Sequence, residues 1–357
     1  MNATTSELPM DRPAPGLLGQ AELGRIPDSV LRLGIRRLCA QRLREERAGG
    51  VADQAARYAK RIAMLRHSPV AIHTDAANAQ HYELPPAFFE RCLGKRLKYS
   101  SGYYPRGVES LDQAEEAMLA LTCERAELAD GQDILELGCG WGSLTLWMAE
   151  RYPAARIVAV SNSHQQREHI LARCRERGLA NVQVRTCDVN LLELDGAAFD
   201  RCVTIEMFEH MRNYETLLGR IGDWLRPGGK LFVHIFAHQH LMYPFETQGD
   251  DNWMGRHFFT GGLMPASDTL LWFQSDLRIE QRWHLDGTHY QRTANHWLAN
   301  QDAQRDAVMR VLSQAYGEQG AALWFQRWRM FWMSCAELFG FDDGQQWLVA
   351  HYRFVRP

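Results

Sequence analysis

The sequence lacks the features that mark several large classes of protein. It has no run of about 18 consecutive apolar residues that could cross a bilayer, and no basic segment followed by an apolar run at its N-terminus. Its 40 basic and 43 acidic residues nearly balance, so overall charge favours neither nucleic acid nor an anionic membrane as a partner. Its eight cysteines stand singly, without the paired spacings of a zinc site or a disulfide framework. We therefore expect a soluble protein without a resident metal, in the reducing cytoplasm.

The chain of 357 residues can bury a sizeable core, as one large domain with additions or as two domains. Prolines near the start predict a mobile tail, and apolar residues at helical spacing among many arginines predict two amphipathic helices from Ser29 to Leu65. We expect five segments: a tail over 1–28, a helical extension with a lid over 29–110, a Rossmann-like core over 111–238, a cap insert over 239–305, and C-terminal helices with closing strands over 306–357.

Strands and helices alternate through the predicted core. A Ser110-to-Gln113 capping box opens a helix that should run to about Leu128. Strands then follow at 134–137, 156–160, 182–186, 199–205 and 230–236, with helices at 142–150, 165–177 and 214–225. This alternation predicts an α/β fold with a parallel, doubly wound, Rossmann-like sheet.

A glycine-rich loop follows the first predicted strand. Its residues Gly138, Gly140 and Gly142 lack the side chains that would keep a nucleotide-like ligand from the backbone, and N–H groups at the next helix start would face that ligand. The spacing is not the dinucleotide Gly-x-Gly-x-x-Gly. With Glu136 it reads Glu-x-Gly-x-Gly-x-Gly, which resembles the loop that holds the amino acid end of S-adenosylmethionine (SAM) in methyltransferases.

Polar residues also follow the second and third predicted strands, at the same edge of the sheet. Asn162 and Gln166 stand where many methyltransferases have a carboxylate for the ribose hydroxyls, so they would serve instead. Asp188, followed by Val189, is placed to accept a hydrogen bond from the adenine amino group. A turn cap is an equal alternative for Asp188 taken alone, but within this series we favour the adenine contact.

The fourth predicted strand ends in two acids and a histidine. If a helical turn begins at Glu206, then Glu206, Glu209 and His210 share one face at the carboxyl edge of the sheet. Such a cluster can bind an ammonium, accept its proton and hold the amine in line with a methyl donor. The structural alternative is that the acids favour a helix dipole and His210 pairs with one of them. The position after a Rossmann-like strand favours catalysis.

The chain resembles the cyclopropane fatty acid synthase superfamily of SAM-dependent methyltransferases, and within it the coclaurine N-methyltransferase group. The resemblance covers 81–354 and implies a class I methyltransferase fold with SAM as cofactor and S-adenosylhomocysteine (SAH) as product. It also implies that Tyr99 and Ser100 contact SAM together with the glycine loop. The matching stretches are 82–85, 98–103, 137–142, 206–210, 258–262 and 336–340.

The same resemblance separates two branches. Cyclopropane synthases bind a bicarbonate with a cysteine, a Glu-His pair, a histidine on the next strand and a tyrosine near the C-terminus. This chain has Glu209-His210 and His234 in matching places, but it has Ser101 for the cysteine, and the run 329–332 lacks the tyrosine. Glu206 stands where the synthases usually have glycine and the N-methyltransferases have glutamate, so the amine branch is favoured.

By this resemblance, Glu206 would bind or orient an amine, and Glu209 with His210 would accept its proton. A lid over 81–104 would close over cofactor and substrate and exclude water. The candidates for the substrate pocket are His234, Phe236, Phe259, Trp328 and Trp332, and core packing is an equal alternative for each of the four aromatic residues.

We therefore expect a SAM-dependent N-methyltransferase for a small, aromatic or alkaloid-like amine. The first alternative is a cyclopropane synthase or related lipid carbon methyltransferase, for which the arginine-rich segment 32–47 could contact a membrane surface. The second is a SAM-binding module without activity, against which the complete acidic cluster argues. A homodimer is left open.

Overall fold

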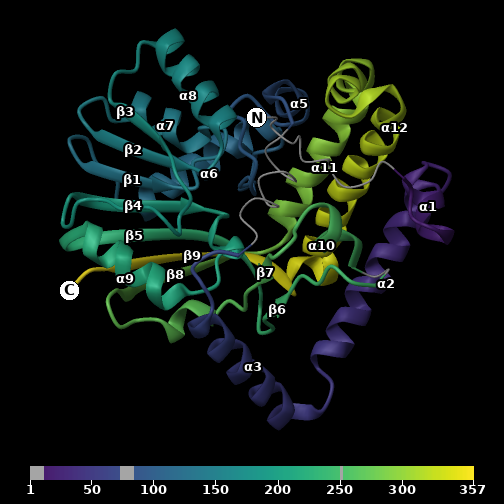
Figure 1. Ribbon diagram of the computed structural model, residues 1–357, viewed down its shortest axis with the longest axis horizontal. Helices are drawn as coiled ribbons and strands as arrows, with labels where there is room; N and C mark the ends of the chain where they lie inside the picture. Colours follow the sequence, from purple (N-terminus) through teal and green to yellow (C-terminus); the bar gives the residue numbers. More distant parts are fainter. Residues whose placement is uncertain (1–11, 73–83, 250–251) are drawn as a thin grey trace, which may run out of the picture.

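The computed structural model describes residues 12–72, 84–249 and 252–357 and is built on a seven-stranded sheet. This sheet occupies the left half of the view in Figure 1. Five strands run parallel: β1 (Asp133–Leu137), β2 (Arg156–Ser161), β3 (Val182–Thr186), β4 (Phe199–Ile205) and β5 (Leu225–His238). β9 (Trp347–Val355) lies antiparallel between β5 and β8 (Arg278–Leu285), which gives the order β3-β2-β1-β4-β5-β9-β8. The predicted Rossmann-like class is confirmed.

Helices cover both faces of this sheet, because alternate strand residues are apolar on both sides. Ile134 of β1 packs with α6 (Leu111–Arg125) and α7 (Ser143–Arg151), whereas Leu135 and Leu137 pack on the opposite face. That face carries α9 (Tyr214–Trp224) and the end of α3 (Gly50–His67). α8 (His164–Arg177) packs beside α7 over β2 and β3. The predicted capping box at Ser110 begins α6.

An aromatic helical layer lies beyond the carboxyl ends of the strands (Figure 1). Its main helices are α11 (Thr288–Ala303) and α12 (Arg305–Phe339), which Gly317 interrupts with a φ of 72°. The other elements of this region are α2 (Asp28–Glu46), α5 (Pro86–Cys92), α10 (Trp253–His257), the β6 (Tyr243–Pro244) and β7 (Leu263–Met264) pair, and the short turns η1 (Phe208–His210), η3 (Thr269–Trp272) and η4 (Phe341–Gly344).

The expectation of a tail over 1–28 is wrong for its second half, while residues 1–11 lie outside the described residues. α1 (Gly16–Glu22) packs against α12, and Glu22 is fully buried. The Glu22 carboxylate accepts hydrogen bonds from the Trp253 indole at 2.8 Å and from Arg327 Nε at 3.0 Å. Both partners are more than 200 residues away in sequence, so the local composition could not indicate this docking.

The cap insert predicted over 239–305 is also too long. Arg278–Leu285 forms β8, the edge strand of the central sheet, rather than part of a cap. Its side chains are mostly exposed and polar, so it lacks the apolar alternation that predicts a strand. The two helices expected from Ser29 to Leu65 are present as α2 and α3.

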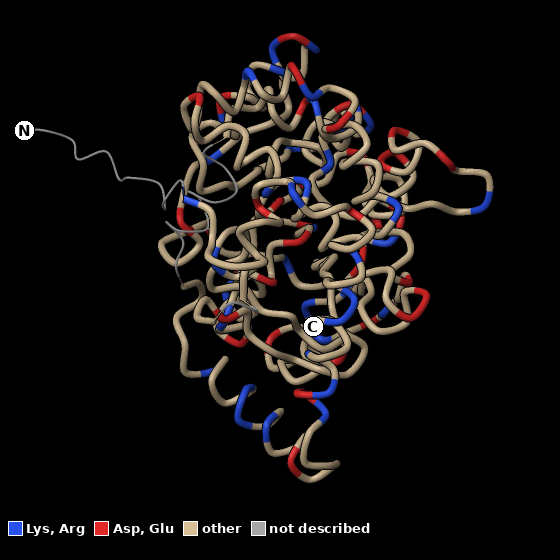
Figure 2. Tube along the Cα trace, turned by 90° about the vertical axis from the view of Figure 1, so that its right-hand side faces the viewer, with Lys and Arg blue, Asp and Glu red and all other residues tan. Residues whose placement is uncertain are grey.

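Within the described ranges, no helix combines the length and the apolar character needed to cross a membrane. Acidic and basic residues are interspersed along the trace, as Figure 2 shows, in agreement with the near-neutral composition.

Candidate active site

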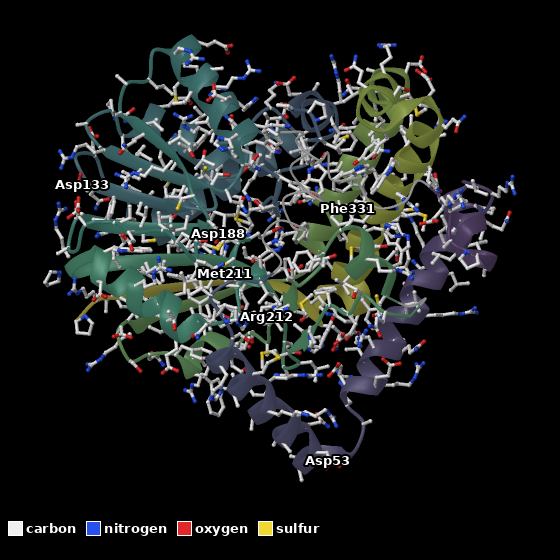
Figure 3. The ribbon with its side chains drawn as sticks, in the orientation of Figure 1. Asp53, Asp133, Asp188, Met211, Arg212 and Phe331 are labelled. Carbon is white, nitrogen blue, oxygen red and sulfur yellow. The ribbon has the colours of Figure 1, made fainter. Side chains whose placement is uncertain are left out.

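A cavity of about 160 Å³ opens at the carboxyl ends of β1, β2, β3 and β4. Figure 3 shows its setting: Asp133 lies where β1 begins, whereas Asp188 and Met211 lie near the other ends of the strands, on the side of Phe331 in α12. The lining includes most of the predicted cofactor residues and part of the acidic cluster: Tyr99, Ser100, Glu136, Gly138, Gly140, Asn162, Gln166, Val189, Glu206 and His210.

The three loop glycines have different roles, although all have positive φ. A Cβ atom added to Gly138 would lie 2.8 Å from Met207, and one added to Gly142 would lie 2.6 Å from Ile170. These two glycines therefore permit close packing, and Gly142 does not line the cavity. Around Gly140, apart from its two neighbours in the chain, no atom of the described residues lies within 4 Å of the added Cβ. Gly140 is thus the position at which the backbone is left open to a ligand.

Alanine at position 140 should separate binding from folding. We expect Gly140→Ala to fold, with a cost of about 1–2 kcal/mol from the left-handed backbone. Its Cβ would stand in the cavity, so SAH affinity should fall by about tenfold or more, equivalent to ~1.4 kcal/mol. Calorimetric titration with SAH and thermal unfolding measure the two effects. Gly142→Ala is the control, because its clash with Ile170 should mainly lower stability. Unchanged SAH affinity in Gly140→Ala would contradict this assignment.

The cavity has polar groups that suit SAM. Ser143 Oγ, Gln166 Nε2 and Thr122 Oγ1 are buried in its lining, and none has a hydrogen-bond partner among the described residues. Glu136 is also buried there, and burial raises the pKa of its carboxyl to about 8, with Thr145 as a hydrogen-bond donor at 2.5 Å. Because buried polar groups are normally paired, a ligand with ammonium, carboxylate and hydroxyl groups would complete this site.

Asp188 does not line the cavity, although its neighbours Cys187 and Val189 do. Its Oδ1 accepts a hydrogen bond from the Asn190 backbone N–H at 2.7 Å. In this structure the Asp188 carboxylate therefore caps a turn, which is the alternative that the sequence left open.

The acidic cluster is not built as one helical face. Glu206 has a φ of 46°, and the turn begins only at Phe208, as the 3₁₀ helix η1. As a result, Glu206 and His210 line the cavity, whereas Glu209 is turned beneath it and is fully buried. Glu209 Oε1 accepts a hydrogen bond from the Phe236 N–H at 2.7 Å, and Oε2 has no partner in the described part of the chain.

Three donors hold the Glu206 carboxylate. Oε1 accepts from the Ser101 N–H at 3.0 Å and from His234 Nε2 at 3.1 Å. Oε2 accepts from the Tyr290 hydroxyl at 2.6 Å, and the buried Lys98 ammonium adds a favourable charge. Each of these interactions stabilises the ionised form.

Glu206 and Glu209 differ in how readily they ionise. Burial raises the pKa of Glu206, but the charge of Lys98 and the hydrogen bonds from Tyr290 and the Ser101 N–H oppose this rise. Burial raises the pKa of Glu209 well above its ordinary value, and repulsion by Glu206 raises it further. When the pair holds one proton, Glu209 therefore carries it and Glu206 is the carboxylate.

A second cavity of about 100 Å³ adjoins the first on the side of α11 and α12. It shares Tyr99, Glu206 and His210 with the first cavity, so a molecule in each would meet at these three residues. Its other lining is aromatic and apolar: Phe236, Phe245, Met254, Phe259, Met264, Tyr290, Trp297, Phe331, Cys335, Leu338 and Phe339.

Only two of the predicted substrate residues, Phe236 and Phe259, line this second cavity. Trp328 and Trp332 are buried in the aromatic core, where their ring centroids lie 5.0 Å apart. His234 is also fully buried and contacts Glu206 from behind. A tryptophan-rich helix does not by itself reveal which of its faces meets a cavity.

Tyr290 and Lys98 lie at the site, and the sequence did not indicate them. The run 329–332 lacks a tyrosine, as the sequence shows, but α11 brings Tyr290 to Glu206 across 84 residues of sequence. Burial lowers the pKa of Lys98 to about 8, and its ammonium donates to the Ser101 carbonyl at 2.8 Å. Lys98 lies in the stretch 98–103, which matches the family, but no local sequence pattern marks it as part of the site.

Comparison with known proteins identifies the family. The model of the family described as mycolic acid cyclopropane synthetase matches residues 71–347. The chain belongs to this family. It is a SAM-dependent methyltransferase, as predicted. The (S)-coclaurine N-methyltransferase of Thalictrum flavum subsp. glaucum is 35% identical to this family member over 344 residues, which cover 95% of each chain.

One solved structure and one more distant relative are also similar to this chain. A crystal structure of coclaurine N-methyltransferase bound to N-methylheliamine and SAH matches with a TM-score of 0.91 and 37% identity, covering 95% of this chain and 98% of that chain. The cyclopropane-fatty-acyl-phospholipid synthase of Escherichia coli (strain K12) is 28% identical over 283 residues, which are 77% of this chain and 67% of the synthase.

Proposed function

We propose that this methyltransferase transfers a methyl group from SAM to the nitrogen of a small aromatic, alkaloid-like amine. The observation that carries the proposal is the junction of two different cavities at Tyr99, Glu206 and His210. One cavity has the glycine loop and polar groups that suit SAM, and the other has aromatic walls. Relatives named coclaurine and pavine N-methyltransferases, at 35% and 32% identity, support an alkaloid amine.

Glu206 is suited to hold the amine at this junction. Its carboxylate is the only acidic side chain among the described residues that lines both cavities. An ammonium group beside it would be stabilised by the ion pair and by the faces of the surrounding aromatic rings. Because these walls exclude water, the attraction acts in a medium of low effective dielectric constant.

The amine must lose its proton before it can act as a nucleophile. We assign proton acceptance to His210, which lines the same junction, whereas Glu209 beneath the turn already holds the proton of the acidic pair. SAM, when bound, supplies the methyl group as an electrophilic sulfonium. The apolar walls then favour the neutral amine over its hydrated ion.

Of the residues that the lipid alternative requires, a tyrosine is present in the structure, whereas Ser101 still stands in place of the cysteine. Tyr290 provides a tyrosine hydroxyl, as a bicarbonate site would require. However, the Ser101 N–H and the Tyr290 hydroxyl both donate to the Glu206 carboxylate. A carboxylate in that position repels an anion, so the same donors favour an ammonium.

Incubation of the purified protein with SAM should decide between the two substrates. We expect a gain of one methyl group on nitrogen for benzylisoquinoline-like amines, measured by mass, and no product from phospholipid vesicles with unsaturated acyl chains. Reactions without SAM are the control. A methylene gained by the acyl chains, with no amine product, would replace the proposed function by the lipid alternative.

We also keep a cytoplasmic location as part of the proposal. All eight cysteines are free thiols, which supports a reducing compartment. A homodimer remains a prediction that size-exclusion chromatography with light scattering would test.

A further inference from the structure

A chain of hydrogen bonds runs from Glu206 through the sheet to the end of α6. His234 Nε2 lies 3.1 Å from Glu206 Oε1, and His351 Nε2 lies 2.9 Å from His234 Nδ1. Arg125 Nη1 lies 2.7 Å from His351 Nδ1. His234 on β5 and His351 on β9 are register partners in the antiparallel pair, so the backbone sets their separation. The amine chemistry proposed above does not use Arg125 or His351.

The chemistry of the groups fixes the direction of this chain. A guanidinium can only donate hydrogen bonds, so His351 Nδ1 must accept from Arg125. Burial lowers the pKa of both histidines well below the ordinary value, which makes both rings neutral. A neutral ring that accepts at Nδ1 carries its hydrogen at Nε2. His351 therefore donates to His234, and His234 donates to Glu206.

We propose that Arg125 and His351 are positioning residues that lock His234 in the Nε2–H tautomer and so keep an N–H donor on Glu206. Without this lock, His234 could carry its hydrogen at Nδ1 and turn a lone pair toward Glu206 Oε1. That arrangement favours a protonated Glu206, which cannot pair with an ammonium. The consequence for turnover rests on the proposed amine function, whereas the tautomers of the two histidines do not depend on it.

The outer end of the chain is held in place. Arg125 is the last residue of α6 and is partly buried, and its guanidinium lies 4.9 Å from the centre of the Trp283 ring. Arg353 approaches the same ring at 5.7 Å, but it pairs with Glu280 and Glu127 and donates to the Arg125 carbonyl. Arg353 thus shares the environment of Arg125 without belonging to the chain.

Other titratable groups interact with Glu206 or line the same cavity, and they would remain in place in the variants below. They come from the segment before α6, the turn η1, and the helices α11 and α12: Lys98, Glu209, His210, Tyr290 and Cys335.

Nitrogen NMR of protein labelled with ¹⁵N-histidine and bound to SAH tests the tautomers directly. We expect His234 and His351 to be neutral, with hydrogen at Nε2 only, and the signals can be assigned from the His351 variants. In His351→Phe and Arg125→Met, the His234 signals should shift toward those of the Nδ1–H form. A charged or Nδ1-protonated His234 in the unaltered protein would overturn the proposal. So would His234 signals that stay the same in both variants.

The pH profile of kcat/KM for amine methylation tests the consequence. In His351→Phe and Arg125→Met, the acid limb should move to higher pH, with a loss of roughly 3- to 10-fold at neutral pH, as expected for one hydrogen bond. The loss should shrink as pH rises, because Glu206 then ionises without help. His351→Gln should restore the profile, since its amide oxygen can accept from Arg125 while its NH₂ donates to His234.

Arg353→Met is the matched control and should leave the acid limb unchanged. An equal shift in Arg353→Met and Arg125→Met would assign the effect to the surroundings of Trp283 and overturn the proposal. Arg125→Met changes a partly exposed side chain, so it keeps the test available if His351→Phe does not fold. If no amine is methylated at all, the NMR result still decides the tautomers, so the two proposals can fail separately.

Discussion

Glu206→Gln should lower kcat/KM for the amine by about 100-fold or more, in the range attributed to a positioned acid or base. The amide keeps the shape of the side chain but removes the charge that pairs with an ammonium. It also places NH₂ hydrogens against the donors that now point at the carboxylate, from Ser101, His234 and Tyr290. Methyl transfer followed by mass gives the rate. SAH affinity, measured by calorimetry, should change little, because the glycine loop is untouched.

Two further variants make this result interpretable. Tyr290→Phe removes one donor from Glu206 and should cause a smaller loss, about 2- to 12-fold for one hydrogen bond. Glu337→Gln is the matched control, since Glu337 is a buried acid on α12 that pairs with Arg32 and Arg36 and lines neither cavity. It should affect stability rather than turnover. If Glu206→Gln methylates the amine as fast as the unaltered protein, then Glu206 does not hold the substrate.

Glu22→Gln should lower the free energy of unfolding by about 3–5 kcal/mol, the cost of removing one partner from a buried ion pair. Arg327 is 1% exposed and Glu22 is 0% exposed, so the remaining guanidinium would be left without a counter-charge out of water. The same carboxylate also accepts from the Ala14 N–H at 2.7 Å and from the Trp253 indole at 2.8 Å. Urea unfolding followed by tryptophan fluorescence measures the loss.

The contribution of Glu22 should also depend on pH. Burial by itself raises the pKa of Glu22, but the Ala14 N–H, Trp253 and Arg327 together bring it below the ordinary value of 4.5. A carboxyl whose pKa is lowered by folding stabilises the folded state fully above its unfolded pKa, and this contribution is lost as pH falls through its folded pKa. The difference in the free energy of unfolding between the unaltered protein and Glu22→Gln should therefore shrink below about pH 4.5.

An exposed acid provides the comparison for this effect. Glu45 lies on the surface of α2, so Glu45→Gln should change the free energy of unfolding by no more than about 0.5 kcal/mol. Equal losses in Glu45→Gln and Glu22→Gln would mean that the docking of α1 does not depend on the buried pair.

The features that the sequence predicted are those encoded within a few neighbouring residues. The Ser110 capping box, the strand before Gly138 and the helix after it each depend on contacts within one turn or one loop. The acidic cluster was found for the same reason, although the positive φ of Glu206 changed its geometry. The positive φ sends Glu206 and Glu209 to different sides of the turn, which sequence spacing alone does not reveal.

The features that the sequence missed depend on contacts between distant segments. Tyr290 reaches Glu206 because α11 packs beside the sheet, and His351 reaches His234 because β9 pairs with β5. Glu22 looks like a surface acid until Trp253 and Arg327 are brought to it. The polar edge strand β8 is recognisable only from its neighbour β9.

The separation of the two cavities has a consequence for how this enzyme could acquire new substrates. The aromatic cavity is built largely from α11, α12 and the segment between β5 and β8, whereas the glycine loop belongs to the sheet. Substitutions at Phe331, Leu338 or Phe339 can therefore reshape the acceptor side while the donor side keeps its structure. A library of variants at those helix positions should change which amines the enzyme accepts and leave its binding of the methyl donor unchanged.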